Sequence, residues 1–321
     1  MSKLIGIGEC LIDFLPAKNN QYIMKSGGAP VNVCACVAML GEKSYFLGKL
    51  SKDFFGEFLL KNIKNSGINT EYISYSNEST SLAFVSLDEK GDRHFSFYRD
   101  NNADLLLDEN EVKSEYFEKG DVLHMCSVGL VESPSKYAHI KAIKLAKQNN
   151  SFICFDVNIR LSLYPSEKKC KDTVLEFLPY ANIIKLTDEE LEFLIGKIDE
   201  KNAIQKLFEI SKDAKFVFLT KGENGATVYD RNLNSIKKPA LKVKVVDTTG
   251  AGDCFIGCVI YKLLTIKNEL QLKDMAEVLN FAIAGSSIVV TKKGAMNAMP
   301  NLKQVNKVLK EIHNENNWKI S

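Results

Sequence analysis

Apolar runs of strand length alternate with longer stretches in which apolar residues recur at helical spacing. The stretch at 53–66 shows the helical pattern most clearly, with Phe54, Phe55, Phe58, Leu59 and Ile63 on one face before Gly67. The apolar runs predict strands at 3–9, 45–48, 122–125, 152–156, 183–186 and 216–220. Helices are predicted at 29–40, 53–66, 135–148 and 189–195. Repeated strand–helix–strand order predicts a mainly parallel sheet with helices on both faces, an α/β fold.

The segment around 80–100 breaks this alternation. Residues 81–87 and 93–98 both have β-rich composition, and the polar stretch 88–92 between them predicts a hairpin turn. We therefore expect a small separate β-sheet that projects from the α/β body.

Composition and charge exclude several classes of protein. The chain has 321 residues, with 42 Lys and Arg against 40 Asp and Glu, and the charges are scattered. Such a balance argues against a nucleic-acid-binding protein or a polybasic membrane anchor. The apolar stretches 31–40 and 281–290 are too short to span a bilayer. The N-terminal residues show no signal-peptide pattern, so we expect a cytoplasmic protein.

The eight cysteines lie mostly inside apolar runs, and the sequence contains no CxxC and no HExxH. Buried free thiols in a reducing compartment are therefore expected rather than disulfides or a zinc site. The four histidines are far apart in the sequence, so no metal-ligand cluster built on His or Cys is predicted.

Polar and glycine-rich residues follow several of the predicted strands. In parallel sheets ligands bind beyond the carboxyl ends of the strands, which makes these loops the candidate site. They contain Asp13, the Gly27–Pro30 turn before Asn32, the 156–160 segment with Arg160, and the 220–225 segment with Gly222 and Gly225.

The segment Gly250-Ala251-Gly252-Asp253 precedes an apolar run of helical length. Glycines at a helix start leave backbone N–H groups uncovered, and such a site binds an anion. A carboxylate beside a phosphate is a poor binding group, but it suits a base that takes a proton from an attacking hydroxyl. An alternative explains the same residues equally well: the acidic residue simply favours a helix N-terminus, and the glycines mark a turn. The segment lacks the GxxxxGK[ST] pattern, and Phe255 replaces the third glycine of a dinucleotide fingerprint.

Two motifs together resemble a known family. DTTGAGD at 247–253 and GGAPVN at 27–32 resemble the DTxGAGD and GGxxxN elements of the ribokinase-like (PfkB) carbohydrate kinases, and they occur in the family's order. The resemblance extends over nearly the whole chain and is greatest to fructokinases. It includes GECLIDFLP at 8–16, LAFVSLDEKGDRHFSFYR at 82–99, FDVNIR at 155–160, IIKLTDEELEFL at 183–194 and TKKGAMNAMP at 291–300.

The resemblance implies a three-layer α/β/α ribokinase-like domain with a β-sheet lid, and an enzyme that converts ATP and a sugar into ADP and a sugar phosphate. Residues 1–13, 26–78 and 104–321 would form the main domain, and 14–25 and 79–103 the lid, with a short strand near 14–25. In many relatives two lids pair, which leaves open a homodimer through the lid. By this resemblance Asp253 is the catalytic base for the 6-hydroxyl of fructose, and the amides of Gly250, Ala251 and Gly252 stabilise the transferred phosphoryl group.

The same resemblance assigns the binding residues. The residues predicted to contact the sugar are Asp13, Gly27, Gly28, Asn32, Arg99 and Asp253. Those predicted to contact ATP are Arg160, Lys185, Thr220, Gly222, Gly225, Asn280 and Gly294. The family uses Mg²⁺ with ATP, which Glu190 would organise through water, and often K⁺. The monovalent cation would bind Asp247, Thr249, Val289, Lys292 and Gly294.

Several positions depart from the family pattern. Thr187 replaces the Asn of the NxxE element, Ala298 replaces a Ser that helps bind K⁺ in ribokinases, and Asn101-Asn102-Ala103-Asp104 replaces Pro-Ser-Ala-Asp beside Arg99. The last change leaves the sugar open, with 2-keto-3-deoxygluconate or a riboside as the alternatives. A non-catalytic sugar sensor is the alternative from another class, but the intact Asp253 and glycine run argue against it.

Overall fold

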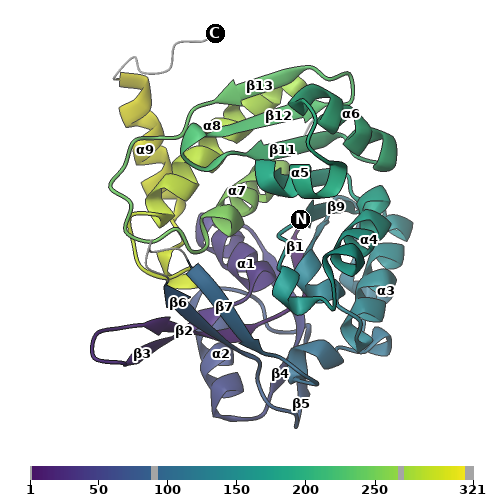
Figure 1. Ribbon diagram of the computed structural model, residues 1–321, viewed down its shortest axis with the longest axis vertical. Coiled ribbons are helices and arrows are strands. Elements are labelled where there is room, and N and C mark those ends of the chain that lie inside the picture. The colour runs from purple at the N-terminus through teal and green to yellow at the C-terminus, as the bar shows by residue number, and fades with distance from the viewer. Residues whose placement is uncertain (1, 88–92, 267–270, 315–321) are drawn as a thin grey trace.

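A nine-stranded sheet with helices on both faces makes up most of the chain in the computed structural model, which describes residues 2–87, 93–266 and 271–314 (Figure 1). In order across the sheet, the strands are β13 (Ser235–Lys238), β12 (Ala226–Asp230), β11 (Phe216–Thr220), β10 (Ile183–Thr187), β9 (Phe152–Asp156), β8 (Val122–Cys126), β1 (Leu4–Ile7), β4 (Ser44–Ser51) and β5 (Ile73–Ser76). All neighbours pair in parallel except β11–β12 and β12–β13.

Two hydrophobic cores lie on the two faces of this sheet. Successive strand residues alternate between them; Cys154 of β9 faces one core, while its neighbours Ile153 and Phe155 face the other. Burial on both faces explains why the strands read as continuous apolar runs. The helices of the first core are α1 (Ala29–Leu40), α2 (Phe54–Asn65), α7 (Ala251–Thr265), α8 (Leu272–Val289) and α9 (Leu302–Asn314). Those of the second are α3 (Pro134–Gln148), α4 (Glu167–Phe177), α5 (Asp188–Ile195) and α6 (Glu200–Ile210).

A separate four-stranded sheet contacts α2 through β2 and β3 and projects from the body (Figure 1). Its order is β3 (Tyr22–Gly27), β2 (Leu11–Pro16), β6 (Leu82–Leu87) and β7 (Arg93–Tyr98). β2 pairs antiparallel with β3 and parallel with β6, and β6 pairs antiparallel with β7.

The structure confirms the α/β class, the small β-sheet and each strand and helix predicted above, with ends that shift by a few residues. The predicted turn at 88–92 lies outside the described residues, but the strands that flank it pair from Leu87 to Arg93.

The expectation of one short strand near 14–25 is wrong. Residues 11–27 form two antiparallel strands, and Asn19 and Asn20 make the turn with φ of 60° and 55°. Asn tolerates this left-handed conformation better than most residues, so the chain reverses here. The two strands reach from Leu11 to Gly27, so Asp13 and Gly27 belong to the small sheet.

Among the described residues, no helix combines the length and the apolar character needed to cross a bilayer.

Candidate active site

The order of strands in the large sheet reverses at β1. The chain runs outward from β1 through β4 to β5, and then returns to β8 on the other side of β1. Loops that follow strands on either side of such a reversal separate and leave a crevice at the carboxyl edge of the sheet. A cavity of about 340 Å³ lies at this edge. It is lined by Glu9, Leu11, Asp13, Gly28, Ala29, Asn32, Phe97, Val128, Asn158, Arg160, Lys185, Thr187, Glu190, Thr248, Thr249, Gly250, Gly252 and Asp253.

Asn32 and Asp253 meet at the centre of this cavity. The Asn32 Nδ2 atom, on the first turn of α1, donates to Asp253 Oδ2 on the first turn of α7 at 2.8 Å. Burial raises the pKa of the Asp253 carboxyl, while this hydrogen bond and the positive charges of Lys185 and Arg160 oppose the rise. Asp253 is therefore a carboxylate whose basicity is increased by its surroundings, as a general base requires.

The start of α7 depends on two glycines. Gly250 caps the helix in the left-handed region (φ 77°), and a Cβ there would lie 2.8 Å from the Ala295 Cβ atom. A Cβ on Gly252 would lie 3.1 Å from Lys185 Nζ, so the missing side chain lets the ammonium group approach the helix N-terminus. The Ala251 amide donates to Thr248 O at 3.2 Å within the turn, and Ala251 does not line the cavity. Gly250 and Gly252 therefore form the cavity wall at this N-terminus.

Lys185 brings a buried positive charge to the same point. Its Nζ atom lies 2.9 and 3.1 Å from the two oxygens of Asp156, and both side chains are almost fully buried. Burial raises the pKa of Asp156 to about 7, although Lys185 acts in the opposite direction. β9 and β10 are adjacent parallel strands with Lys185 opposite Asp156, which places this pair beneath the start of α7.

The other end of the cavity is bounded by the small sheet. Asp13 on β2 lies over Gly27 on β3, where a Cβ would come 2.1 Å from the Asp13 Oδ2 atom. Gly28 has φ 116°, and a Cβ there would lie 2.4 Å from Glu9 O. The two glycines thus make room for the carboxylate and for the loop after β1. Leu11 and Phe97 add apolar surface from the same sheet.

Glu9 is a cavity residue that the sequence interpretation missed. It follows β1 and is 2 % exposed, and its Oε1 atom accepts from the Ala29 amide at 2.8 Å, at the start of α1. Burial raises the pKa of its carboxyl to about 7, although the nearby Arg99 guanidinium lowers it. Its position directly after a strand is the sequence signal that indicates it, but the prediction for this segment named only Asp13.

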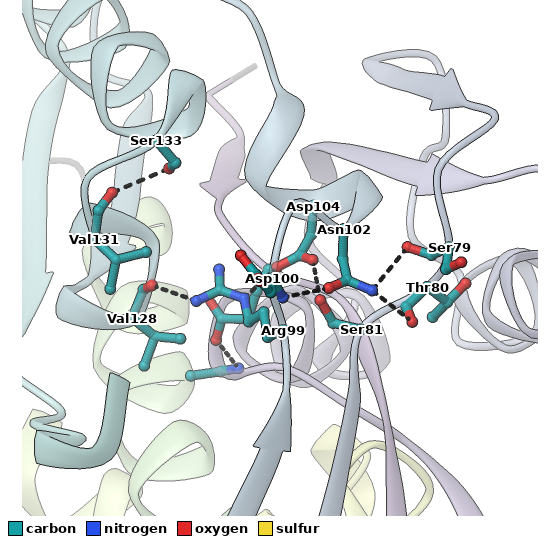
Figure 2. A network of polar contacts seen from close by, with 12 residues as sticks. Ser79, Thr80, Ser81, Arg99, Asp100, Asn102, Asp104, Val128, Val131 and Ser133 are labelled. Atoms are coloured by element: carbon teal, nitrogen blue, oxygen red, sulfur yellow. Dashed lines mark hydrogen bonds and ion pairs between the residues drawn. The ribbon is translucent and has the colours of Figure 1, made fainter. Parts of the chain in front are cut away.

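Arg99 does not line the cavity. Its Nε atom pairs with Asp104 Oδ2 at 2.7 Å and its Nη1 atom donates to Val128 O at 3.0 Å (Figure 2). Asp104 also accepts from Ser81 Oγ at the start of the small sheet. Arg99 therefore connects the end of β7 to the Val128 segment of the cavity wall.

Glu190 and Thr187 form one structural unit at the start of α5. Thr187 Oγ1 accepts from the Glu190 amide at 3.1 Å, and Glu190 Oε2 accepts from the Thr187 amide at 2.9 Å. Glu190 Oε1 accepts from the Ile159 amide at 2.8 Å. Thr187, which replaces the family's Asn, is thus the N-cap of α5 and holds Glu190 toward the cavity.

Asp247 joins two loops beside α7. Its Oδ1 atom accepts from the Thr249 amide at 2.8 Å and its Oδ2 atom from the Gly294 amide at 3.0 Å. The Val289 carbonyl accepts from the Lys292 amide at 3.0 Å. Of the residues predicted for a monovalent cation, Asp247, Thr249 and Gly294 therefore meet at this junction, and the Asp247 amide donates to the carbonyl of Val290, next to Val289, at 3.2 Å. Hard cations favour carboxylate and carbonyl oxygens.

Five residues predicted to bind ATP lie outside the cavity: Thr220, Gly222, Gly225, Asn280 and Gly294. Thr220 ends β11 opposite Thr187 of β10, and Gly222 and Gly225 form the turn from β11 to β12. Asn280 lies on α8, and its buried Oδ1 atom has no hydrogen-bond partner among the described residues.

The cavity is also lined by residues to which the sequence interpretation gave no role in the site. Asn158 has a left-handed backbone (φ 40°) in the loop after β9, a loop that the sequence does indicate. Ala29 and Thr248 lie in the Gly27–Pro30 turn and the DTTGAGD motif that the sequence indicates, whereas only the fold brings Val128 to the wall.

The family model for pfkB family carbohydrate kinases matches residues 1–302. The chain belongs to the pfkB family of carbohydrate kinases. It is thus an enzyme that phosphorylates a sugar, as the resemblance predicted.

Curated relatives of this pfkB carbohydrate kinase include plant fructokinases. It is 37% identical to "Fructokinase-2" of Solanum lycopersicum, with 96% of each chain covered. It is 36% identical to "Probable fructokinase-4" of Arabidopsis thaliana, over 96% of this chain and 97% of the relative.

Solved structures of similar fold carry related names. Fructokinase from Xylella fastidiosa with bound ATP has a TM-score of 0.90 and 30% identity, over 97% of this chain and 99% of that one. A fructokinase double mutant from Vibrio cholerae O395, bound to fructose, ADP and potassium ion, has a TM-score of 0.90 and 30% identity, over 96% and 98%. Aminoimidazole riboside kinase from Salmonella enterica, with aminoimidazole riboside and an ATP analogue, has a TM-score of 0.86 and 26% identity, over 96% and 99%.

Proposed function

We propose that this pfkB carbohydrate kinase is an ATP-dependent fructokinase that converts fructose into fructose 6-phosphate. The observation that supports the proposal is the hydrogen bond between Asn32 and Asp253 at the N-terminus of α7, because a carboxylate and a helix N-terminus then line one cavity. The fructokinases among its relatives and structural neighbours support fructose as the sugar.

In the proposed reaction the 6-hydroxyl oxygen of fructose bonds to the γ-phosphorus of ATP. The bond from that phosphorus to the bridging oxygen breaks, and ADP leaves. The proton of the hydroxyl passes to an Asp253 oxygen, whose raised pKa makes the carboxylate a better base. The other sugar oxygens are held at the opposite end of the cavity by Asp13, Gly27, Gly28 and Asn32. Arg99 supports this end through its hydrogen bond to the Val128 carbonyl.

The transferred phosphoryl group lies at the start of α7 in this proposal. The amides of Gly250 and Gly252 and the helix dipole stabilise its negative charge, and Lys185 and Arg160 bring positive charge to the same point. Ala251 contributes less than the resemblance implied, because its amide donates within the turn. ATP extends from here toward Thr220, Gly222, Gly225, Asn280 and Gly294.

Two cations are part of the proposal. Glu190 suits Mg²⁺ held through water, because its carboxylate lines the cavity and two backbone amides fix its direction. Mg²⁺ that arrives with ATP would neutralise phosphate charge. K⁺ would bind at the junction of Asp247, Thr249, Val289, Lys292 and Gly294, and stabilise the loop before α7.

The small sheet is proposed as a lid that excludes water from the reacting groups. Its outer aromatic residues support a homodimer through this lid. Tyr22 and Tyr98 are 48 % and 64 % exposed, and both contact Phe84 edge-on at 5.5 Å between ring centroids. A sedimentation measurement of mass tests this part directly: a monomer at micromolar concentration would contradict it.

A riboside is the second candidate substrate, because the structure is also similar to a riboside kinase bound to its riboside. The test is a coupled assay of ADP release with Mg-ATP. The panel is fructose, ribose, 2-keto-3-deoxygluconate, glucose, adenosine and an aminoimidazole riboside, each with and without K⁺. Turnover on fructose far above the rest supports the proposal, and higher kcat/KM on another member overturns the choice of sugar. Absence of turnover on every member, with fructose binding by calorimetry, would indicate a sugar sensor instead.

A further inference from the structure

Three buried cysteines converge behind the proposed catalytic base. The Cys36 Sγ atom on α1 lies 3.9 Å from the Sγ atoms of both Cys254 and Cys258 on α7, and those two are 4.0 Å apart. All three are free thiols with 0 % exposure. The expectation that no cluster of His or Cys exists is therefore wrong. It failed because 218 positions separate Cys36 from Cys254, and only the packing of α1 on α7 brings them together.

The spacing of the three sulfur atoms matches that of a three-coordinate metal site. A metal–sulfur bond of about 2.3 Å places the three sulfurs of a planar site about 4.0 Å apart, and those of a tetrahedral site about 3.8 Å apart. The observed triangle lies within this range and is nearly equilateral. An ion at its centre would need almost no movement of the ligands.

Two glycines in the surrounding helices make this convergence possible. A Cβ on Gly257 of α7 would lie 2.8 Å from the Cys36 Sγ atom, and one on Gly285 of α8 would lie 2.4 Å from the Cys258 Sγ atom. Glycine inside a helix is less favourable than alanine, because it loses more conformational freedom on folding. Here the missing side chains leave the space that the thiols occupy.

We propose that Cys36, Cys254 and Cys258 form a binding site for one soft, thiophilic metal ion of the Cu⁺ type. Thiolates select soft ions such as Cu⁺, whereas Zn²⁺ in structural sites almost always takes four ligands. The ligand groups found among the described residues supply three. Binding replaces sulfur–hydrogen bonds by sulfur–metal bonds, and the displaced protons pass to solvent.

The site lies next to the proposed catalytic pair. Cys254 follows Asp253 in the chain, and Cys36 is one helical turn after Asn32. A bound ion would therefore link α1 to α7 directly behind the Asn32–Asp253 hydrogen bond. Because the sulfurs already have the bound spacing, the ion should stabilise this junction rather than distort it.

The test is a titration of the purified full chain with Cu⁺, delivered without oxygen from a bicinchoninate complex. Since the thiols are buried, loading is done both on the folded chain and during refolding. We expect one tightly held ion per chain by native mass spectrometry, a higher Tm, and three sulfur neighbours at about 2.3 Å in the copper X-ray absorption spectrum. Cys36→Ala should abolish retention of the ion. Cys34→Ala is the matched control, because Cys34 is equally buried on the same helix and lies outside the cluster.

The proposal is overturned by failure of the wild-type chain to retain an ion under both loading conditions. Equal retention by Cys36→Ala, or equal loss by Cys34→Ala, overturns it as well. If Cys36→Ala does not fold, the absorption spectrum of the wild-type chain decides the matter alone. Two sulfur neighbours, or a shell that includes nitrogen or oxygen, would contradict a three-thiolate site.

Discussion

The Asn32 side-chain amide donates to Asp253 Oδ2 at 2.8 Å across 221 positions of sequence. The bond unites the glycine-rich start of α1 with the glycine-rich start of α7. It also favours the ionised form of Asp253, against the burial that raises the pKa of the carboxyl.

Replacement of Asn32 by Ala should move the acid limb of the kcat/KM profile. The base must be ionised, so activity falls as pH drops below its pKa. Removal of the hydrogen bond raises that pKa further, so the limb should move to higher pH. Cys34→Ala, on the same helix, should leave the profile unchanged. An unshifted limb in Asn32→Ala would show that Asn32 does not tune the base.

Gly250→Ala should lower kcat by about 100-fold, because it distorts the backbone that donates to the phosphoryl group. Its Cβ would meet Ala295 at 2.8 Å in a left-handed conformation. Gly252→Ala should lower kcat by roughly tenfold or less, because its Cβ meets only the end of the Lys185 side chain at 3.1 Å and no backbone atom. Gly196→Ala is the control for backbone strain, since Gly196 has φ 100° and no atom within 4 Å of a Cβ. It should lower Tm and leave kcat unchanged. A normal kcat in Gly250→Ala would remove this turn from the mechanism.

Several features of the fold and the site follow from the sequence. The strands were predictable because burial on both faces makes them continuous apolar runs. The loops after the strands were predictable as the site, because parallel strands bring their carboxyl ends to the same edge of the sheet. The sequence interpretation did not assign the strands β5, β12 and β13 or the helices α4, α6, α8 and α9. β12 and β13 continue from β11 as antiparallel neighbours, so they do not follow the strand–helix alternation on which the prediction rested. Glu9 was missed because its role depends on a tertiary contact. Its carboxylate accepts from the Ala29 amide at the start of α1, and the sequence does not show that α1 begins there.

Arg99 shows most clearly what sequence could not provide. The lid position suggested a group that reaches the sugar, whereas the side chain is buried and paired with Asp104. Its partners come from a short-range turn and from the Val128 segment, and neither pairing has a sequence signature.

Arg99→Ala should therefore destabilise the chain by about 3–5 kcal/mol, because it leaves a buried carboxylate without its partner. Asp104→Asn in the same background should recover part of that loss in denaturant unfolding. We also expect the sugar KM to rise more than the ATP KM, since Arg99 holds Val128 in the cavity wall. Equal changes in both KM values, with normal stability, would refute this role of Arg99.

Asp247→Ala should remove any activation by K⁺, so that kcat/KM becomes the same in potassium and sodium salts. The variant loses the acceptor of the Thr249 and Gly294 amides and with it the junction of the two loops. A matched change, Asp230→Ala at the end of β12, also removes a carboxylate that accepts from two backbone amides, those of Asn232 and Asn234, and should retain the response of the wild-type enzyme. Persistence of K⁺ activation in Asp247→Ala would place the cation elsewhere.

The most direct test of the proposed mechanism is the kcat of Asp253→Asn, measured together with fructose binding by calorimetry. Loss of a general base lowers turnover by about 10²–10⁴-fold, while the amide keeps a similar shape and a partner for Asn32. We predict such a loss with fructose affinity close to that of the wild-type enzyme. A near-normal kcat would show that Asp253 is not the base and would contradict the mechanism.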